Sequence, residues 1–160
     1  MSISSSVIQP RIQHTASNNS LGVRQKSVGA IILNGKNEVL LVFSSANQYW
    51  EFPKGKMERG EKELDTLARE IYEETGIKHF RLHPLFKENI YYNFRVGNMV
   101  IAKIVVYYLF KTGATVKISD EHSKFQWVHI NDIDQYLKHI NQRNLIKRVR
   151  YFLEHHPFIT

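Results

Sequence analysis

The amino-acid sequence predicts an α/β (α+β) domain, in which a mixed β-sheet lies between helices as an α/β/α sandwich. Three observations predict it. Apolar, β-branched runs come first, a helical pattern follows at residues 62–75, and further strands precede a second helical pattern near the end of the chain. The 160 residues, of which 42% are hydrophobic, suffice for one domain with its own core, and there is no sign of an internal repeat.

Residues 1–25 differ from the rest of the chain. They are rich in Ser, Asn and Gln and contain no acidic residue, since the first acid is Glu38. Such a segment buries too little apolar surface to offset the entropy lost on ordering, so we expect a disordered tail before a folded domain at residues 26–160. We expect a cytoplasmic protein. The acid-free, Ser-rich start, which carries two arginines, also resembles a mitochondrial presequence, and this is the alternative location.

Each expected strand is an apolar run bounded by turn or loop residues. In chain order these runs are residues 27–33, 38–44, the short piece 49–53, 80–94 as one strand or two, 99–110, and 124–130. Asn34-Gly35 is a strong hairpin signal between the first two runs. Pro53 keeps the third from continuing as a central strand. The run 99–110 is interrupted by Lys103 and is shorter than the roughly 20 residues of a membrane-spanning helix.

Three helices are expected. The first, at residues 62–75, has an apolar stripe and ends at Gly76, a residue type that suits the left-handed end of a helix. This stripe consists of Leu64, Leu67, Ala68 and Ile71. A second helix is expected to begin at a cap formed by Asn131 or Asp132 and to run to about His139. The third, at residues 144–156, is amphipathic and is expected to cover one face of the sheet, with its basic residues in solvent.

The helix at residues 62–75 carries an unusual group of acids. Glu70, Glu73 and Glu74 are spaced i, i+3 and i+4, so we expect them to share a face distinct from the apolar stripe. Carboxylates crowded on one rigid face repel each other unless a cation lies beside them. Mg²⁺ is a suitable partner, because it prefers oxygen ligands from carboxylates and substrate phosphates. The alternative is a surface helix with solvated glutamates.

The segment before this helix, residues 54–61, is expected to be a cationic loop. Gly55 and Gly60 permit tight turns and a close approach of the backbone to a ligand. Lys54 and Lys56 are placed to meet phosphate oxygens as point charges. A metal-binding helix beside a cationic loop suits a polyphosphate, and the net charge of +7 also favours polyanionic partners. The absence of cysteine excludes disulfides, thiolate zinc sites and a cysteine nucleophile.

Residues 55–77 resemble the Nudix box, whose pattern is G-x5-E-x7-R-E-U-x-E-E-x-G-U with U aliphatic. The residues at the specified positions are Gly55, Glu61, Arg69, Glu70, Ile71, Glu73, Glu74, Gly76 and Ile77. The resemblance implies a Nudix fold and a hydrolase that uses Mg²⁺ or Mn²⁺ to cleave a diphosphate linked to another moiety. It also implies that Glu70, Glu73 and Glu74 are metal ligands and catalytic residues, and that the Gly55 carbonyl adds a further ligand. Arg69 is then expected to orient a box carboxylate, and Glu61 to support it.

Members of this family often add an acid from a later loop, and the candidate here is Glu121. It lies just before the last expected strand, which contains Trp127. The resemblance implies a metal ligand or the general base at this position. The alternative is an exposed loop glutamate beside Asp120. Nudix subfamilies differ in the carboxylate that deprotonates the water, so the identity of the base stays open.

Residues 50–61 resemble the corresponding run of the asymmetric diadenosine tetraphosphate hydrolases, as does the EH-x-x-x-x-W spacing of residues 121–127. The resemblance implies cleavage of diadenosine tetraphosphate to ATP and AMP by a metal-activated water. Tyr91 or Tyr92 is expected to stack on adenine, and only one of the two points into the cleft because alternate strand positions face opposite ways. Lys103 is expected either to face the phosphates or to reach solvent.

Three other functions remain as alternatives. The run FPKGK at residues 52–56 is also close to that of mRNA decapping Nudix proteins, and the basic charge suits RNA, so RNA 5′-end processing comes second. A house-cleaning nucleoside triphosphatase is another enzyme of this class. A Nudix module that binds a nucleotide without cleaving it ranks lowest, because all the box glutamates are present. The expected partner is a small nucleotide, with RNA as the alternative, no membrane, and a monomeric chain.

Overall fold

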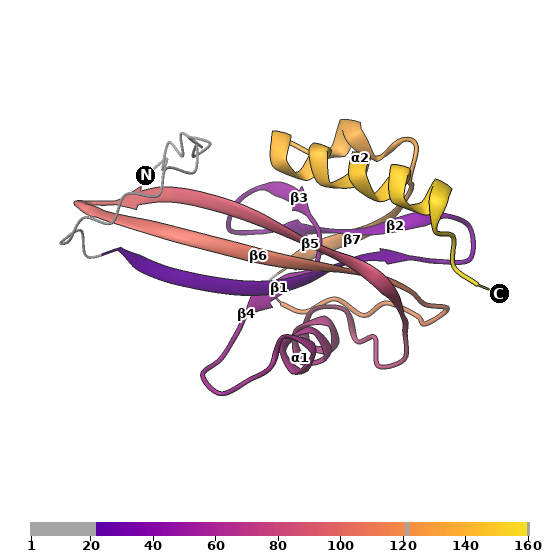
Figure 1. Cartoon of the computed structure of the whole chain (residues 1–160), viewed down its shortest axis with the longest axis horizontal. Coiled ribbons are helices and arrows are strands. Elements are labelled where there is room, and N and C mark those ends of the chain that lie inside the picture. The colour runs from indigo at the N-terminus through magenta and orange to yellow at the C-terminus, as the bar shows by residue number, and fades with distance from the viewer. Residues whose placement is uncertain (1–21, 121, 160) are drawn as a thin grey trace.

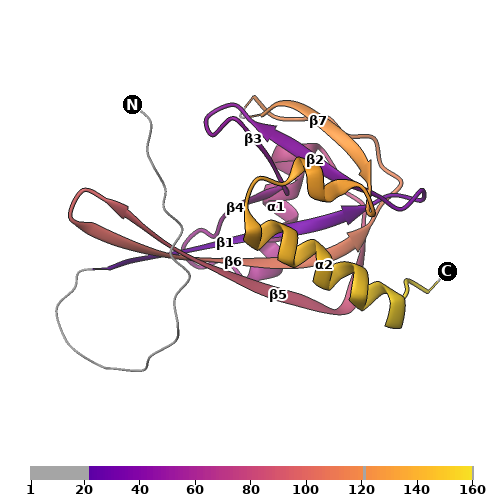
Figure 2. The same ribbon diagram turned by 90° about the horizontal axis from the view of Figure 1, so that it is seen from above.

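A mixed β-sheet lies between two α-helices in the computed structural model, which describes residues 22–120 and 122–159. Helix α1 (Glu63–Thr75) covers one face of the sheet and helix α2 (Ile140–His155) covers the other (Figures 1 and 2). The predicted α/β/α sandwich is therefore confirmed. Within the described residues no helix is long and apolar enough to cross a membrane.

The sheet is built around β1, which has neighbours of both orientations. The strands are β1 (Val23–Leu33), β2 (Glu38–Ser44), β3 (Tyr49–Glu51), β4 (Lys54–Lys56), β5 (Arg81–Val96), β6 (Met99–Lys111) and β7 (His122–His129). Their main order is β3-β2-β1-β6-β5, with β4 paired to β1 and β7 paired to β2. The β1–β6 pair is parallel and the other pairs are antiparallel, so the sheet is mixed.

Strand β1 is apolar at consecutive positions because both faces of the sheet are covered. Ile32 belongs to the same buried cluster as Leu67 of α1, whereas Ile31 belongs to the cluster that contains Leu145 of α2. The expected tail of residues 1–25 is wrong at its end, because residues 23–25 belong to this strand. Residues 1–21 of that expected tail lie outside the described residues.

Residues 54–56 form a strand, so the prediction of a loop over the whole of 54–61 is wrong at its beginning. Strand β4 pairs with β1, where Gly29 is opposite Lys54. A Cβ atom at Gly29 would lie 2.7 Å from both the Lys54 Cβ and the Pro53 carbonyl oxygen. The glycine thus allows β4 to approach β1 closely. A Lys-Gly-Lys sequence carries no strand pattern of its own, and its conformation depends on this tertiary pairing.

The run at residues 80–94 is one strand, β5, with a register shift against β6 between Leu82 and Lys87. The β5–β6 hairpin extends well beyond the part of the sheet that the helices cover (Figure 2). The expected helix from residue 131 or 132 to about residue 139 is wrong. The chain forms only a 3₁₀ turn, η1 (Ile133–Tyr136), which ends because Leu137 is extended, and α2 begins at Ile140.

Arg150 of α2 forms an ion pair with Asp134 of η1, so this basic residue is not simply solvated. Its guanidinium donates to both carboxylate oxygens of Asp134, at 2.8 and 3.1 Å, and to the Ile130 carbonyl at 2.9 Å. Arg150 lowers the pKa of Asp134 below its ordinary value of 3.8. Because the pKa of Asp134 is lower in the folded than in the unfolded protein, the ion pair stabilises the fold at neutral pH. This stabilisation is lost as the pH falls below 3.8 and through the folded-state pKa.

We expect Asp134→Asn to lower the free energy of unfolding at pH 7 by about 0.5–1 kcal/mol, because the pair is partly exposed. The difference from the wild type should shrink as the pH falls below 3.8, where the wild-type carboxyl also becomes neutral. Urea unfolding at several pH values measures it. Asp132→Asn is the control, since this exposed neighbour makes no ion pair among the described residues. Equal losses in both variants would contradict the prediction.

Candidate active site

The buried side of α1 includes one of its clustered acids, Glu74. Leu64 and Ala68, expected to be buried, are exposed, while Leu67 and Ile71 are buried as expected. The buried stripe is therefore rotated toward Thr66 and Glu74, which are 0% and 7% exposed. Helix α1 ends at Gly76, which adopts a left-handed conformation with φ of 72° and donates its N–H to the Tyr72 carbonyl at 2.9 Å.

Two of the three clustered glutamates converge on the two residues Lys54 and Gly55 of β4, the Lys54–Gly55 peptide. Glu74 accepts a hydrogen bond from the Lys54 backbone N–H at 3.1 Å. The Glu70 carboxyl lies directly against Gly55, since a Cβ atom there would be only 1.8 Å from the Glu70 Cδ. The third acid, Glu73, has a side chain that is 56% exposed. Of the three carboxylates expected to share one face, two therefore converge and the third, that of Glu73, points outward.

Arg69 ties the segment before α1 to the helix. Its Nε and Nη2 donate to the two oxygens of Glu61, at 2.9 and 2.7 Å, and Nη2 also donates to the Lys56 carbonyl at 2.9 Å. Its Nη1 donates to Glu70 at 2.7 Å and to Glu73 at 3.4 Å. Hydrogen bonds from Arg69 are the main reason that the pKa of Glu61 is lowered to about 2. Arg69 and Glu61 together hold the Glu70 carboxylate in place.

A largely buried polar cluster contains Glu74, one of the two convergent acids, together with Glu51, Lys54 and His122. Glu51 accepts from the Lys54 Nζ at 3.3 Å, and its other oxygen lies 3.2 Å from the His122 Nε2. Burial raises the pKa of Glu74 to about 8, although His122 and Lys54 oppose the shift. Burial also acts to raise the pKa of Glu51, but the hydrogen bond to His122 and the charge of Lys54 outweigh it and the pKa is lowered.

Sequence reasoning did not identify Glu51 or His122. The available signal was a charged residue inside an apolar run, since Glu51 stands between Trp50 and Phe52. Lys103 in β6 is likewise a charged residue inside an apolar run. A buried acid is rarely unpaired, and one of the two partners of Glu51, His122, is far away in sequence.

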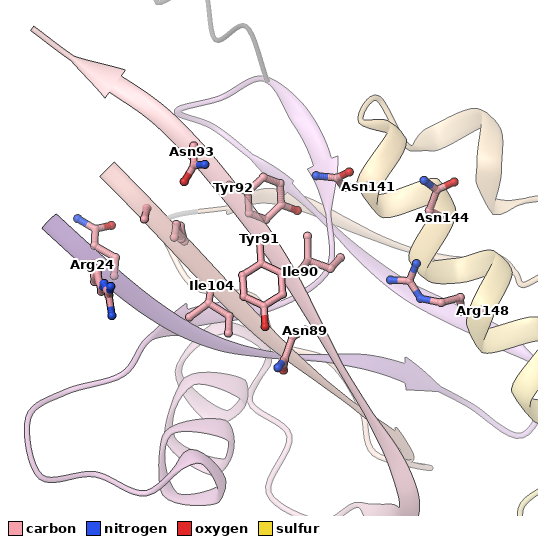
Figure 3. Close-up of a pocket in the computed structure, with 13 residues that line it drawn as sticks. Arg24, Asn89, Ile90, Tyr91, Tyr92, Asn93, Ile104, Asn141, Asn144 and Arg148 are labelled. Carbon is pink, nitrogen blue, oxygen red and sulfur yellow. The ribbon is translucent and has the colours of Figure 1, made fainter. Parts of the chain in front are cut away.

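A cavity of about 710 Å³ lies between the β5–β6 hairpin and the start of α2 (Figure 3). The polar and charged residues that line it are Arg24, Gln25, Asn89, Tyr91, Tyr92, Asn93, Lys103, Asn141, Asn144 and Arg148. Tyr92 points toward α2, whereas Tyr91 points to the other side of β5 and is 58% exposed (Figure 3). Burial raises the pKa of Tyr92 to about 12. The two neighbouring tyrosines therefore have different surroundings.

Three lysines give the neighbourhood of the cavity a positive charge. Lys103 is opposite Tyr92 in the β5–β6 register and lines the cavity. Burial, followed by repulsion from Lys54, lowers the pKa of Lys103 to about 8, and Lys56 contributes in the same direction. The Lys56 side chain is exposed. Because these cations are close enough to repel each other, an anion with several charges would relieve the repulsion.

The donor chemistry fits a hard divalent cation. Glu70 and Glu74 offer carboxylate oxygens at the Lys54–Gly55 peptide, and oxygen ligands with retained waters are what Mg²⁺ prefers. Among residues 22–120 and 122–159, no three acidic or histidine side chains already form a group that could hold a metal ion. The outward position of Glu73 accords with this. Glu121, the remaining expected ligand, lies outside the described residues.

Comparisons with known proteins identify relatives of this chain. A family model described as the NUDIX domain matches residues 23–149. An RNA pyrophosphohydrolase of Campylobacter jejuni subsp. doylei is 30% identical over 122 residues, which cover 69% of this chain and 78% of the relative. The asymmetrical bis(5′-nucleosyl)-tetraphosphatase of Rattus norvegicus is 28% identical over 120 residues, or 72% of this chain and 79% of the relative.

The fold is also similar to solved structures. A C. elegans Ap4A hydrolase, in a binary complex, has a TM-score of 0.72 and 27% identity to this chain, and covers 82% of this chain and 98% of its own. A MutT protein of Methanosarcina mazei has a TM-score of 0.65 and 28% identity, with 83% and 97% covered. The similarity therefore extends over nearly the whole length of these related structures.

Proposed function

This chain belongs to the Nudix family of hydrolases, and on that basis we propose that it cleaves diadenosine tetraphosphate asymmetrically, to ATP and AMP. The observation that carries the proposal is the convergence of Glu70 and Glu74 on the Lys54–Gly55 peptide, beside a cavity bordered by lysine. Such a site combines oxygen ligands for a metal with cations for a polyphosphate. The similarity to the rat tetraphosphatase and the C. elegans Ap4A hydrolase supports the choice of substrate.

Glu70 and Glu74, together with Glu73 and the Gly55 carbonyl, would hold Mg²⁺ or Mn²⁺. Bound there, a divalent ion neutralises phosphate charge and lowers the pKa of a water molecule. Arg69 orients the Glu70 carboxylate through the 2.7 Å hydrogen bond, and Glu61 keeps Arg69 in place. Glu121 stays a candidate for a further ligand or the general base.

The substrate phosphates are proposed to lie along Lys54, Lys56 and Lys103. Compact ammonium groups bind phosphate oxygens as point charges. The adenine is proposed to enter the cavity and stack on Tyr92, which points toward α2, rather than on Tyr91 (Figure 3). Of the two tyrosines, Tyr92 is the one next to Lys103 across the β5–β6 pair, so its ring borders the proposed path of the phosphates.

We expect Tyr92→Leu to raise KM, because the lost stacking is worth about 1–3 kcal/mol, or roughly a 5- to 150-fold change in affinity. Leucine retains an apolar side chain where Tyr92 packs against the core. Tyr91→Leu is the matched control, one position away on the other side of the strand, and should leave KM close to that of the wild type. Steady-state kinetics on diadenosine tetraphosphate measure both. A larger effect at Tyr91 would reverse the assignment.

A substrate panel with product analysis tests the proposed function. The panel contains diadenosine tetraphosphate, 5′-triphosphorylated RNA, capped RNA and oxidised dGTP, each with Mg²⁺. Formation of ATP and AMP from the first compound, faster than any other cleavage, is the expected result. Preferred hydrolysis of oxidised dGTP would instead indicate a house-cleaning triphosphatase. Binding without turnover of any compound would indicate a non-catalytic nucleotide-binding module.

RNA 5′-end processing is the second candidate function. The similarity to the Campylobacter jejuni RNA pyrophosphohydrolase favours it, as does the net charge of +7. Arg24 and Arg148 line the cavity, where they are available to the phosphates of a longer chain. Cleavage of the RNA substrates alone in the panel would select this function.

A further inference from the structure

Glu51 is a buried carboxylate that connects two separate segments of the site. It is the last residue of β3, and its side chain is only 9% exposed. One oxygen accepts a hydrogen bond from the Lys54 Nζ at 3.3 Å, and the other lies 3.2 Å from the His122 Nε2. A carboxylate is rarely buried without such partners. These two partners belong to β4 and β7, which do not pair with each other.

Both partners are connected to Glu74 by hydrogen bonds. Lys54 donates its backbone N–H to the Glu74 carboxylate at 3.1 Å. His122 directly follows Glu121 in the sequence and donates its backbone N–H to the Ser119 carbonyl at 3.2 Å. The Ser119 N–H donates in turn to the Glu74 backbone carbonyl at 3.1 Å. Glu51 thus closes a ring of contacts that runs from β4 through the end of α1 to the beginning of β7.

We propose that Glu51 is a positioning residue, whose carboxylate holds the Lys54 ammonium and the His122 imidazole in a fixed relation beside Glu74. This inference rests on the proposed function, in which Lys54 binds substrate phosphate. Glu51 acts only through these neighbours. A reactive arrangement is sensitive to small displacements, so a partner that fixes a binding group contributes to turnover without contacting the substrate.

The expected signature is a fall in kcat without a rise in KM. Glu51→Gln keeps the size of the side chain but removes its charge, so Lys54 is less neutralised and attracts phosphate at least as strongly as before. The looser positions of Lys54 and His122 should nevertheless slow the reaction. We expect kcat to fall by about 10- to 100-fold, as is typical when a residue that orients the directly binding groups is replaced. If the Glu51 carboxylate had a purely structural role, Glu51→Gln would lower the thermal stability and leave kcat unchanged.

Glu63→Gln is the matched control. The Glu63 side chain is 16% exposed and also bridges two cations, Lys26 and Lys87, but it does not border the cavity. This variant should keep the wild-type kcat. A double-mutant cycle with Lys54→Met then tests whether Glu51 acts through Lys54. The combined loss of kcat should be clearly smaller than the product of the two single losses, because part of the effect of Glu51 passes through Lys54, whereas independent, multiplicative losses would overturn the proposal.

Hydrogen–deuterium exchange provides a measurement that does not depend on turnover. Glu51→Gln should speed amide exchange in β4 and at the beginning of β7, and Glu63→Gln should not. If this pattern appears but the wild type cleaves nothing in the substrate panel, the proposed function fails and the positioning of these segments by Glu51 stands. Unchanged exchange, or a wild-type kcat, overturns the proposal. Should Glu51→Gln not fold, Glu51→Asp, which is too short to reach both partners, is judged by the same criteria.

Discussion

Replacement of Glu74 by Gln is expected to lower kcat by about 10²- to 10³-fold, as typically follows from the loss of one group that stabilises a transition state. Glu74 is the buried acid of the pair that converges on the Lys54–Gly55 peptide. An amide ligates a hard divalent cation more weakly than a carboxylate, because it carries no charge. The effect should therefore appear in turnover at saturating substrate and saturating Mg²⁺.

The fold should survive this change. The amide oxygen of Gln can still accept the hydrogen bond from the Lys54 N–H, and a buried neutral group costs less than a buried charge. Thermal unfolding and circular dichroism check that the variant is folded, and titration calorimetry with Mg²⁺ checks metal affinity. Glu63→Gln, the same substitution on the same helix, should retain activity. A folded Glu74→Gln enzyme with the wild-type kcat would rule out the proposed metal site.

Substitution of Gly55 by Ala is expected to cause the second large loss, about 10²-fold in kcat/KM, which is the cost of displacing a reacting group by about 1 Å. The added Cβ would lie 1.8 Å from the Glu70 Cδ and the Glu70 Oε2, so the carboxylate must move. Its movement would also disturb the 2.7 Å hydrogen bond from Arg69. The family resemblance implies that the Gly55 backbone carbonyl is a metal ligand. The structure adds a steric requirement, because a side chain at residue 55 would displace the Glu70 carboxylate.

Gly113→Ala is the control for this substitution. A Cβ atom at Gly113 meets no other atom within 4 Å, so this variant should match the wild type in both stability and activity. Steady-state kinetics and thermal unfolding on the three proteins provide the comparison. Full activity of Gly55→Ala would mean that Glu70 is not held against residue 55 in the active enzyme.

Local patterns predicted much of the fold. The runs at 27–33 and 38–44 correspond to β1 and β2, and the hairpin between them occurs where Asn34-Gly35 indicates it. Helix α1 begins within one residue of its expected start and ends before Gly76. The helix expected from residue 131 or 132 failed because a capping residue type does not ensure a cap. Asp132 makes no side-chain cap hydrogen bond, and only the four residues of η1 follow it.

Long-range contacts account for what sequence reasoning missed. β4 depends on its pairing with β1, and the contact between Glu51 and His122 joins residues 71 positions apart. Neither contact leaves a periodic trace in the sequence. The rotation of α1 is a similar case, because four apolar positions defined a stripe but only Leu67 and Ile71 are buried.

The sequence by itself determined that Glu70, Glu73 and Glu74 lie close together on one helix, because helical spacing is a local property of the chain. Only the tertiary structure decided which of them turn inward. Glu70 and Glu74 meet the Lys54–Gly55 peptide because β4 pairs with β1 and α1 packs beside it, whereas Glu73 remains exposed. The physical reason is that helical spacing places side chains relative to one another, whereas the packing of the helix against the sheet decides which of them are withdrawn from water.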